Sequence, residues 1–218
     1  MPINLGKLQP REFYERPAYE VAPDMLGCVL VQEVDGQVLR AVICETEAYE
    51  GQDDQACHAR RGQTPRCQVM FEDAGHAYIY FTYGMHWMLN VVCEPKGFPA
   101  AVLIRAIFPI EGIETMQAFR QNLAGTSKWL DGPAKLTQAL GLNGSMNGAD
   151  LCDPLSGLRI EQGISVPNAL IQVTPRIGIN YTPEPWKSIP WRWFVPYIKM
   201  AELIGQTQTK EDQPLFKP

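Results

Sequence analysis

Two hairpin signals constrain the fold of this chain more than any other feature. Residues 28–49, CVLVQEVDGQVLRAVICETEAY, have the pattern of two strands joined at Asp35-Gly36, a dipeptide typical of tight β-turns. Residues 76–94, HAYIYFTYGMHWMLNVVCE, form a second such pattern that turns at Gly84, and the apolar run 100–109 indicates a buried strand. Strands joined by hairpins favour an antiparallel sheet.

Helical patterns flank these strands. Residues 11–27 predict a short helix broken at Pro17 and a second helix that ends near Gly27. Two further helices are predicted within 110–123, where Ile113, Met116, Phe119 and Leu123 are helically spaced, and within 131–141. Shorter strands are expected within 157–163, 171–179 and 190–195. We predict one α+β domain over 1–218, with a mostly antiparallel curved sheet, surrounding helices, a protruding hairpin and a polar, frayed tail from about 206.

Composition limits the classes of protein to which the chain can belong. Hydrophobic residues make up 45% and charged residues 20% of the 218, as in foldable globular proteins. No apolar run has the roughly 18 residues of a membrane span, and the N-terminus lacks a signal-peptide core. The six scattered cysteines indicate reduced thiols. We expect no membrane association, no secretion, and a cytoplasmic or nucleoid-associated protein (nuclear if eukaryotic). The net charge of −5 argues against coating nucleic acid by bulk electrostatics.

Acidic side chains alternate along the second predicted strand. Period-two spacing places Ile43, Glu45, Glu47 and Tyr49 on one face. A glutamate there could serve as a base, although a solvent-facing strand end explains the pattern equally well. Arg105 lies inside an apolar strand and requires a partner. Glu47 is a natural candidate, and a structural ion pair with another acid is an equal alternative.

Motifs for bound cofactors are lacking in the sequence. The three histidines and six cysteines do not have zinc-site spacing, and there is no glycine-rich dinucleotide or phosphate-binding motif. We therefore expect neither a metal nor a cofactor, and cofactor-free acid–base chemistry remains.

Taken in order, several motifs resemble the alkyladenine (3-methyladenine) DNA glycosylase family. These are ETEAY, a following His58, RRGQTPR, YIYFTYGMHWMLN, VLIRA, GPAKLTQAL, RIGI and PWRWFV, over roughly Pro17 to Val195. The resemblance implies an enzyme that flips alkylated or deaminated purines (3-methyladenine, ethenoadenine or hypoxanthine) from duplex DNA and hydrolyses the glycosidic bond. No lysine stands out as a nucleophile, so a monofunctional enzyme without lyase activity is expected.

The resemblance also implies roles for individual residues. Glu47 corresponds to the general base, Arg105 to a group that holds the water, and Ile177 to a backbone carbonyl that binds it. The remaining positions are the base-pocket residues Tyr49, His58, Tyr80 and Asn90, the DNA wedge Tyr83 and Met85, and the candidate phosphate contacts Arg60, Arg61, Lys135 and Arg176. Asn90 would disfavour the extra amino group of guanine. Cys67 and His86 depart from the family pattern, where an Asn and an aromatic residue are expected.

The three tyrosines of the second hairpin should have different roles. Tyr78 and Tyr80 share a strand face, whereas Tyr83 has the opposite parity and lies beside Gly84, where the chain turns. We expect Tyr80 to stack on the flipped base, Tyr78 to pack within the body and Tyr83 to project from the tip. The expected partner is duplex DNA with damaged purines, bound by a monomer. Two rival classes remain: a nucleoside or sugar glycosidase that pairs Glu47 with Glu45 or Asp53, and a non-catalytic nucleic-acid binder.

Overall fold

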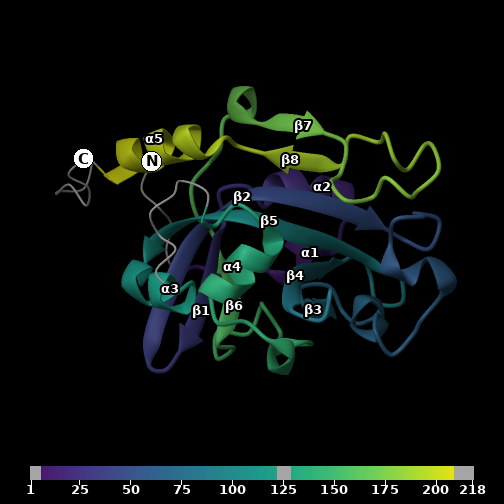
Figure 1. The fold of residues 1–218 in the computed structure, drawn as a ribbon, viewed down its shortest axis with the longest axis horizontal. Helices are drawn as coiled ribbons and strands as arrows, with labels where there is room; N and C mark the ends of the chain where they lie inside the picture. The colour runs from purple at the N-terminus through teal and green to yellow at the C-terminus, as the bar shows by residue number, and fades with distance from the viewer. Residues whose placement is uncertain (1–5, 122–128, 209–218) are drawn as a thin grey trace.

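One antiparallel sheet organises the computed structural model, which describes residues 6–121 and 129–208 (Figure 1). Its central path runs β3-β4-β5-β2-β1-β6, with β8 paired to β2 and β7 to β8. The strands are β1 (Val29–Val34), β2 (Gln37–Glu50), β3 (Ala77–Thr82), β4 (His86–Cys93), β5 (Ala100–Glu111), β6 (Leu158–Glu161), β7 (Gln172–Thr174) and β8 (Arg192–Phe194). The predicted single α+β domain with a curved, antiparallel sheet is confirmed.

Both predicted hairpins are present, and each has two successive left-handed residues in its turn, although two residues join β1 to β2 and three join β3 to β4. Asp35 and Gly36 have φ values of 51° and 73°, and Tyr83 and Gly84 have 51° and 66°. Two successive positive φ values characterise the type I′ turn, whose twist matches that of paired strands. Asp-Gly is a usual sequence for this turn, whereas a bulky tyrosine at its first central position is not. The second hairpin therefore carries a residue that turn formation alone does not favour.

Helices cover the sheet (Figure 1). They are α1 (Arg11–Tyr14), α2 (Ala18–Asp24), α3 (Ile113–Phe119), α4 (Pro133–Ala139) and α5 (Tyr197–Gln208), with short 3-10 helices η1 (His58–Arg61), η2 (Gln68–Phe71), η3 (Gly144–Met146) and η4 (Asn168–Leu170). The main core takes side chains from α2, α3, α4 and the sheet. None of the described helices has the length and apolar character needed to cross a membrane.

The C-terminal end differs from the prediction. Helix α5 was not predicted, and it extends to Gln208, beyond the expected start of a frayed tail at about 206. Met200 and Ile204, one helical turn apart, are buried beside Val195 and Phe108 in a second apolar cluster. This packing explains why the helix forms. Residues 209–218 and Leu123 of the predicted 110–123 helix lie outside the described residues.

Candidate functional site

An irregularity in the pairing of β2 with β5 sets the direction of the acidic side chains. Ile43 pairs with Ile107, Glu45 with Ala106 and Thr46 with Ile104, so the register shifts twice within this stretch. Ile43 packs in the main core together with Ala48, although simple alternation separates these two residues. The prediction that Ile43 shares a face with Glu45, Glu47 and Tyr49 is therefore wrong, because a β-bulge interrupts the alternation.

Glu47 is completely buried, and three donors reach its carboxylate. The Ile177 amide donates to Oε1 at 2.6 Å. The Tyr49 hydroxyl and Arg105 Nη1 donate to Oε2 at 2.9 and 3.1 Å. The predicted pairing of Arg105 with Glu47 is thus present. These contacts satisfy a carboxylate that would otherwise be costly to bury.

The charges around Glu47 balance within a group of four side chains. Glu45 Oε1 accepts hydrogen bonds from Arg105 Nε at 2.8 Å and from Arg192 Nε at 2.6 Å. Two guanidinium groups therefore face two carboxylates. Burial raises the pKa of Glu47 above its ordinary value, while Arg105, the Ile177 amide and the Tyr49 hydroxyl oppose that rise. A carboxylate with a raised pKa is a stronger base than an ordinary glutamate.

A cavity of about 290 Å³ opens beside this group. The four predicted base-pocket residues Tyr49, His58, Tyr80 and Asn90 all line it, and so do Arg105, Ile177, Tyr83 at the hairpin tip and Pro133 at the start of α4. Glu47 itself is not a lining residue, whereas the residues of all three of its donors are. The volume is at the small end of the range for ligand pockets, and the lining is aromatic, as suits a flat ring.

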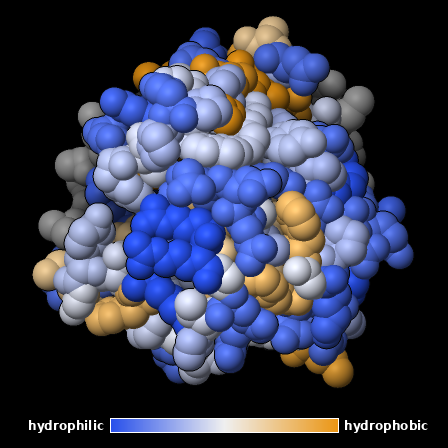
Figure 2. Space-filling view, turned by 90° about the vertical axis from the view of Figure 1, so that its right-hand side faces the viewer, coloured by the Kyte–Doolittle hydropathy of each residue, from blue (hydrophilic) through white to orange (hydrophobic). Residues whose placement is uncertain are grey.

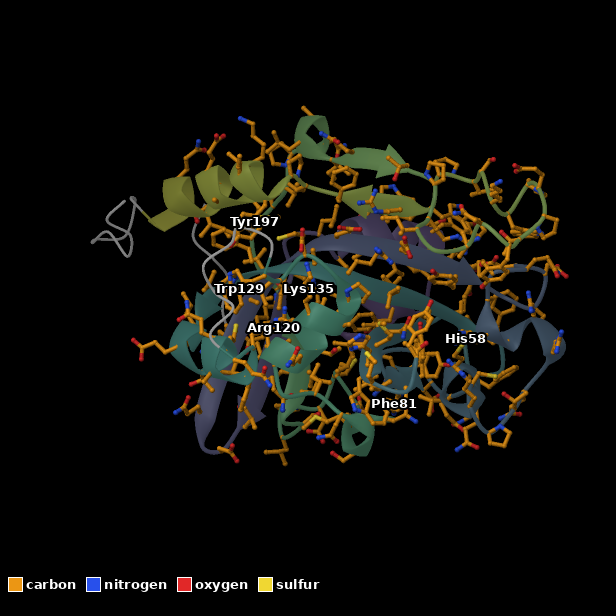
Figure 3. All side chains as sticks on the ribbon, in the orientation of Figure 1. His58, Phe81, Arg120, Trp129, Lys135 and Tyr197 are labelled. Carbon is orange, nitrogen blue, oxygen red and sulfur yellow. The ribbon has the colours of Figure 1, made fainter. Side chains whose placement is uncertain are left out.

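His58 occupies the cavity wall as a neutral side chain. Its Nδ1 lies 2.8 Å from the Tyr78 hydroxyl, and its ring packs edge-on against Tyr80 with centroids 4.5 Å apart. Surrounding protein, together with the charges of Arg66 and Arg60, lowers the pKa of His58 to about 4. Figure 3 places His58 among the side chains at the right-hand end of the sheet. Tyr78, buried and bonded to His58, lies within the body as predicted.

Asn90 joins the cavity wall to the β3–β4 hairpin. It is buried, and its Nδ2 donates to the Tyr78 carbonyl across the strand pair at 3.0 Å. This bond fixes the side chain while the residue lines the cavity. Asn90 therefore has a structural hydrogen bond and a position from which it can contact a ligand.

The hairpin tip projects into solvent. Tyr83 is 85% exposed and Met85 is 68% exposed, and the tip has the strained left-handed backbone described above. Exposed apolar side chains on a strained turn indicate a contact surface rather than a packing role. Tyr83 also lines the cavity mouth, so the tip and the cavity form one continuous feature.

The predicted phosphate contacts have different environments. Arg60 and Arg61 line a shallow depression together with Arg66, next to His58, at the end of the molecule where Figure 2 shows a strongly hydrophilic patch beside apolar side chains. Lys135 lies on α4, where its Nζ pairs with Asp131 at 2.6 Å (Figure 3). Arg176 is buried and paired with Asp54, so the prediction that it contacts phosphate is wrong. Both Nη atoms are hydrogen-bonded inside the protein, whereas the buried Nε has no hydrogen-bond partner among the described residues.

Comparison with known proteins supplies the family. A family model described as methylpurine-DNA glycosylase (MPG) matches residues 12–198. This chain belongs to the methylpurine-DNA glycosylase family.

Relatives from several organisms match along most of their length. The chain is 44% identical over 191 residues to a Burkholderia lata protein named "Putative 3-methyladenine DNA glycosylase", covering 88% of this chain and 89% of that one. Proteins of the same name from Methanocella arvoryzae and Carboxydothermus hydrogenoformans are 46% and 47% identical, over 85% and 86% of this chain and 90% and 95% of theirs. The predicted resemblance is confirmed, and the chain is a DNA glycosylase of the methylpurine type.

Two residues that depart from the glycosylase pattern have identifiable environments. Cys67 is buried, and its sulfur lies 3.4 Å from the Thr64 amide and 3.1 Å from the Thr64 hydroxyl, so the thiol holds the turn before η2 together. His86 lines a shallow depression with Met85 and Trp87 against α4, next to the wedge. Neither residue touches Glu47 in the contacts described.

Sequence reasoning about the glycosylase site missed three features. The Ile177 amide bonds to Glu47, Arg192 bonds to Glu45, and Tyr181 lines both the cavity and the arginine-rich depression. A backbone donor has no residue signature, and Arg192 meets Glu45 only because β8 adds to β2. Tyr181 follows the RIGI motif by two residues, and this proximity was a usable signal. In the described ranges, no three His, Cys, Asp or Glu side chains converge as a metal site would require.

Proposed function

We propose that this methylpurine-DNA glycosylase flips alkylated or deaminated purines, of the 3-methyladenine, ethenoadenine and hypoxanthine class, out of duplex DNA and hydrolyses the bond between base and sugar. The observation that carries the proposal is the buried carboxylate of Glu47, held by Arg105, Tyr49 and the Ile177 amide behind an aromatic cavity. A purine ring fits the shape and chemistry of this cavity. Most of its lining side chains are aromatic or aliphatic, rather than the clustered polar groups that bind a phosphate or a sugar.

Capture of the flipped base rests on stacking. Extrusion costs a few kcal/mol, and each aromatic contact returns about 1–3 kcal/mol per base. Tyr80 and Tyr49 supply these faces, and aromatic faces favour the positive charge of an alkylated purine. His58, with its pKa near 4, is neutral at physiological pH and adds no repulsion to such a base.

Hydrolysis requires one water molecule. Within the described chain, the Ile177 amide is the donor recorded for Oε1 of Glu47, so a second lone pair on that oxygen is left to accept a proton. Water oxygen attacks C1′ of the deoxyribose, its proton passes to Glu47, and the bond from C1′ to the base breaks as the base leaves with the electron pair. Arg105 and the Ile177 carbonyl would hold the water. No lysine is among the cavity-lining residues in the described ranges, which supports a monofunctional enzyme.

DNA contacts outside the cavity follow from the exposed residues. Tyr83 and Met85 would fill the gap left by the extruded base, and Arg60 and Arg61 would contact phosphates next to the cavity mouth, with Lys135 as a further candidate. Few phosphate contacts on an acidic protein imply modest, salt-sensitive affinity. Because residues of one chain line the whole cavity, we expect the protein to act as a monomer.

Base release from defined duplexes tests this function. Duplexes that carry ethenoadenine, hypoxanthine or 3-methyladenine are incubated with the protein, and free base is measured before and after alkali treatment. Release without strand cleavage before alkali is expected, with loss of about 10²–10⁴-fold in Glu47→Gln, which cannot accept the proton, and with retained lesion binding. Binding without release would indicate a non-catalytic module. Release from free nucleosides but not from duplexes would indicate a nucleosidase.

A glycosidase mechanism with two paired carboxylates is less well supported by the contacts. Glu45 is engaged by two arginines, and Asp53 is exposed and does not line the cavity. A glycosidase that pairs Glu47 with either residue would need both groups at the substrate. Activity retained in Glu47→Gln and lost in Glu45→Gln would move the base to Glu45.

A further inference from the structure

Arg176 is the most completely enclosed cation near the site. Its guanidinium lies between two aromatic rings, 4.8 Å from the Tyr49 centroid and 5.2 Å from the Trp191 centroid. Both Nη atoms bond to Asp54, at 2.5 and 2.9 Å. Nη1 also donates to the Ala48 carbonyl at 2.9 Å, and Nη2 donates to the Trp186 carbonyl at 3.2 Å.

These bonds join three segments that line the cavity. The Ala48 carbonyl belongs to β2, between Glu47 and Tyr49. Asp54 belongs to the following loop, where its carboxylate also accepts the amides of Glu50 at 3.2 Å and Ala56 at 2.9 Å. The third segment, which carries Arg176 itself, leads directly to Ile177. One guanidinium therefore sets the relative positions of the strand, the loop and the segment that follows β7.

Two of the three donors to Glu47 depend on this arrangement. Ile177 follows Arg176 in the chain, and its amide reaches Glu47 Oε1. Tyr49 lies under the guanidinium, and its hydroxyl reaches Oε2. A cation on the face of a phenol draws electron density from the ring and makes the hydroxyl a better donor. Through both contacts Arg176 favours the ionised form of Glu47.

A buried ion pair is weak evidence for stability, because desolvation offsets much of the attraction. For the pair of Arg176 with Asp54, the positions in which it holds the surrounding segments are therefore more informative than its contribution to stability. We propose that Arg176, fixed by Asp54, is a positioning residue that acts through Tyr49 and Ile177 to hold Glu47 in its ionised, correctly oriented form. This inference rests on the proposed role of Glu47 as the base.

Other charged and titratable groups also face Glu47. They are Arg105 from β5, Glu45 from β2 with Arg192 of β8 on it, and the hydroxyls of Tyr49 and Tyr80. Of these groups only Tyr49 touches Arg176, so a change at Arg176 leaves Arg105, Glu45, Arg192 and Tyr80 in place. A shift in the titration of Glu47 in an Arg176 variant therefore reports on the two contacts that Arg176 controls.

Arg176→Lys provides the test. Lysine keeps the charge and can pair with Asp54, but it cannot lie flat between two rings while bridging two carbonyls. The pKa of Glu47 is measured by carboxyl-carbon NMR on protein with ¹³C-labelled glutamate, with the signal assigned through Glu47→Gln. The variant should raise that pKa by about one pH unit, equivalent to a tenfold loss in ionisation. Single-turnover base release should fall about tenfold at a pH below the new value, while the Kd for lesion duplex changes less than about threefold.

Arg11→Lys is the matched control, because Arg11 also bridges an aspartate, Asp150, and a backbone carbonyl, that of Ala74, without contact with Glu47. It should leave the pKa of Glu47 and the release rate unchanged. A folded Arg176→Lys protein with the wild-type pKa of Glu47 would overturn the proposal. If this variant does not fold, Trp191→Leu, which removes one face of the stack and keeps the Asp54 pair, decides by the same shift. Absence of base release by the wild type would instead refute the proposed function and leave the NMR result interpretable.

Discussion

Tyr83→Ser separates a wedge from a packing residue. Tyr83 is 85% exposed, so it withholds only about 30 Å² of a ring of about 200 Å² from water. At about 25 cal/mol per Å², this contact contributes less than about 1 kcal/mol to the free energy of unfolding. For a chain of this length, 1 kcal/mol corresponds to roughly 2–4 °C in Tm. We therefore expect the variant to melt within about 3 °C of the wild type.

DNA binding should respond much more strongly. A stacked aromatic is worth about 1–3 kcal/mol, which corresponds to about a 5- to 150-fold weaker Kd for lesion duplex. Titration of the protein into a duplex with ethenoadenine opposite thymine gives the Kd and, from the fluorescence of the lesion, the flipped fraction. Both quantities should fall in Tyr83→Ser. Tyr80→Ala should instead lower the capture of a base that has already been extruded.

Two further variants control the interpretation. Leu155 is 91% exposed and lies away from the cavity lining, so Leu155→Ser should change neither Tm nor binding. Tyr83→Asn suits the left-handed backbone of the turn, and it should be at least as stable as the wild type and bind as weakly as Tyr83→Ser. Early melting of Tyr83→Ser with unchanged flipping would refute the tip assignment and place the tyrosine in the core.

Other variants probe the catalytic group, the selectivity and the pH dependence. Arg105→Ala removes the guanidinium shared by Glu45 and Glu47, so both release rate and stability should fall, the latter by roughly 3–5 kcal/mol in urea unfolding. Asn90→Ser should raise excision of guanine lesions relative to ethenoadenine in a competition assay, and an unchanged ratio would restrict Asn90 to its bond with Tyr78. Burial, with Glu94 nearby, raises the pKa of Glu50 to about 8, so its contribution to stability should be present at acidic pH and be lost as pH rises through about 8. Urea midpoints across this range should flatten in Glu50→Gln, and an identical pH profile would contradict the shift.

Local signals in the sequence were sufficient for the elements that local chemistry determines. Asp35-Gly36 and Gly84 supply the positive φ that type I′ turns need, so both hairpins were predictable. That Arg105 pairs with an acid was also predictable, because a guanidinium in an apolar strand needs one; the sequence did not decide between Glu47 and another acid, and Arg105 bonds both Glu47 and Glu45. The cavity-lining positions of Tyr80 and Asn90 were implied by the resemblance to the glycosylase family, and strand alternation was only compatible with them.

Tertiary contacts determined the features that were missed. Arg176 looks like a surface cation in a proline- and glycine-rich segment, and only the fold brings Asp54 and two aromatic rings around it. The register shift beside Glu45 depends on both β2 and β5, so the sequence of neither strand reveals it alone. Helix α5 forms because Met200 and Ile204 have an apolar cluster to cover, although their spacing was visible.

Because the pairing of β2 with β5 is interrupted, the number of residues between the core residue Ile43 and the proposed general base Glu47 is critical. Odd and even positions of a strand face opposite sides, and the bulge between Ile43 and Thr46 resets that count once. Deletion of Cys44 would remove the extra residue of the bulge, so Glu47 would keep its face under plain alternation from Ile43, while the pairing of β2 with β5 would slip by one residue on one side of the deletion. At this position, chain length constrains the enzyme more tightly than the identity of the residue that fills it.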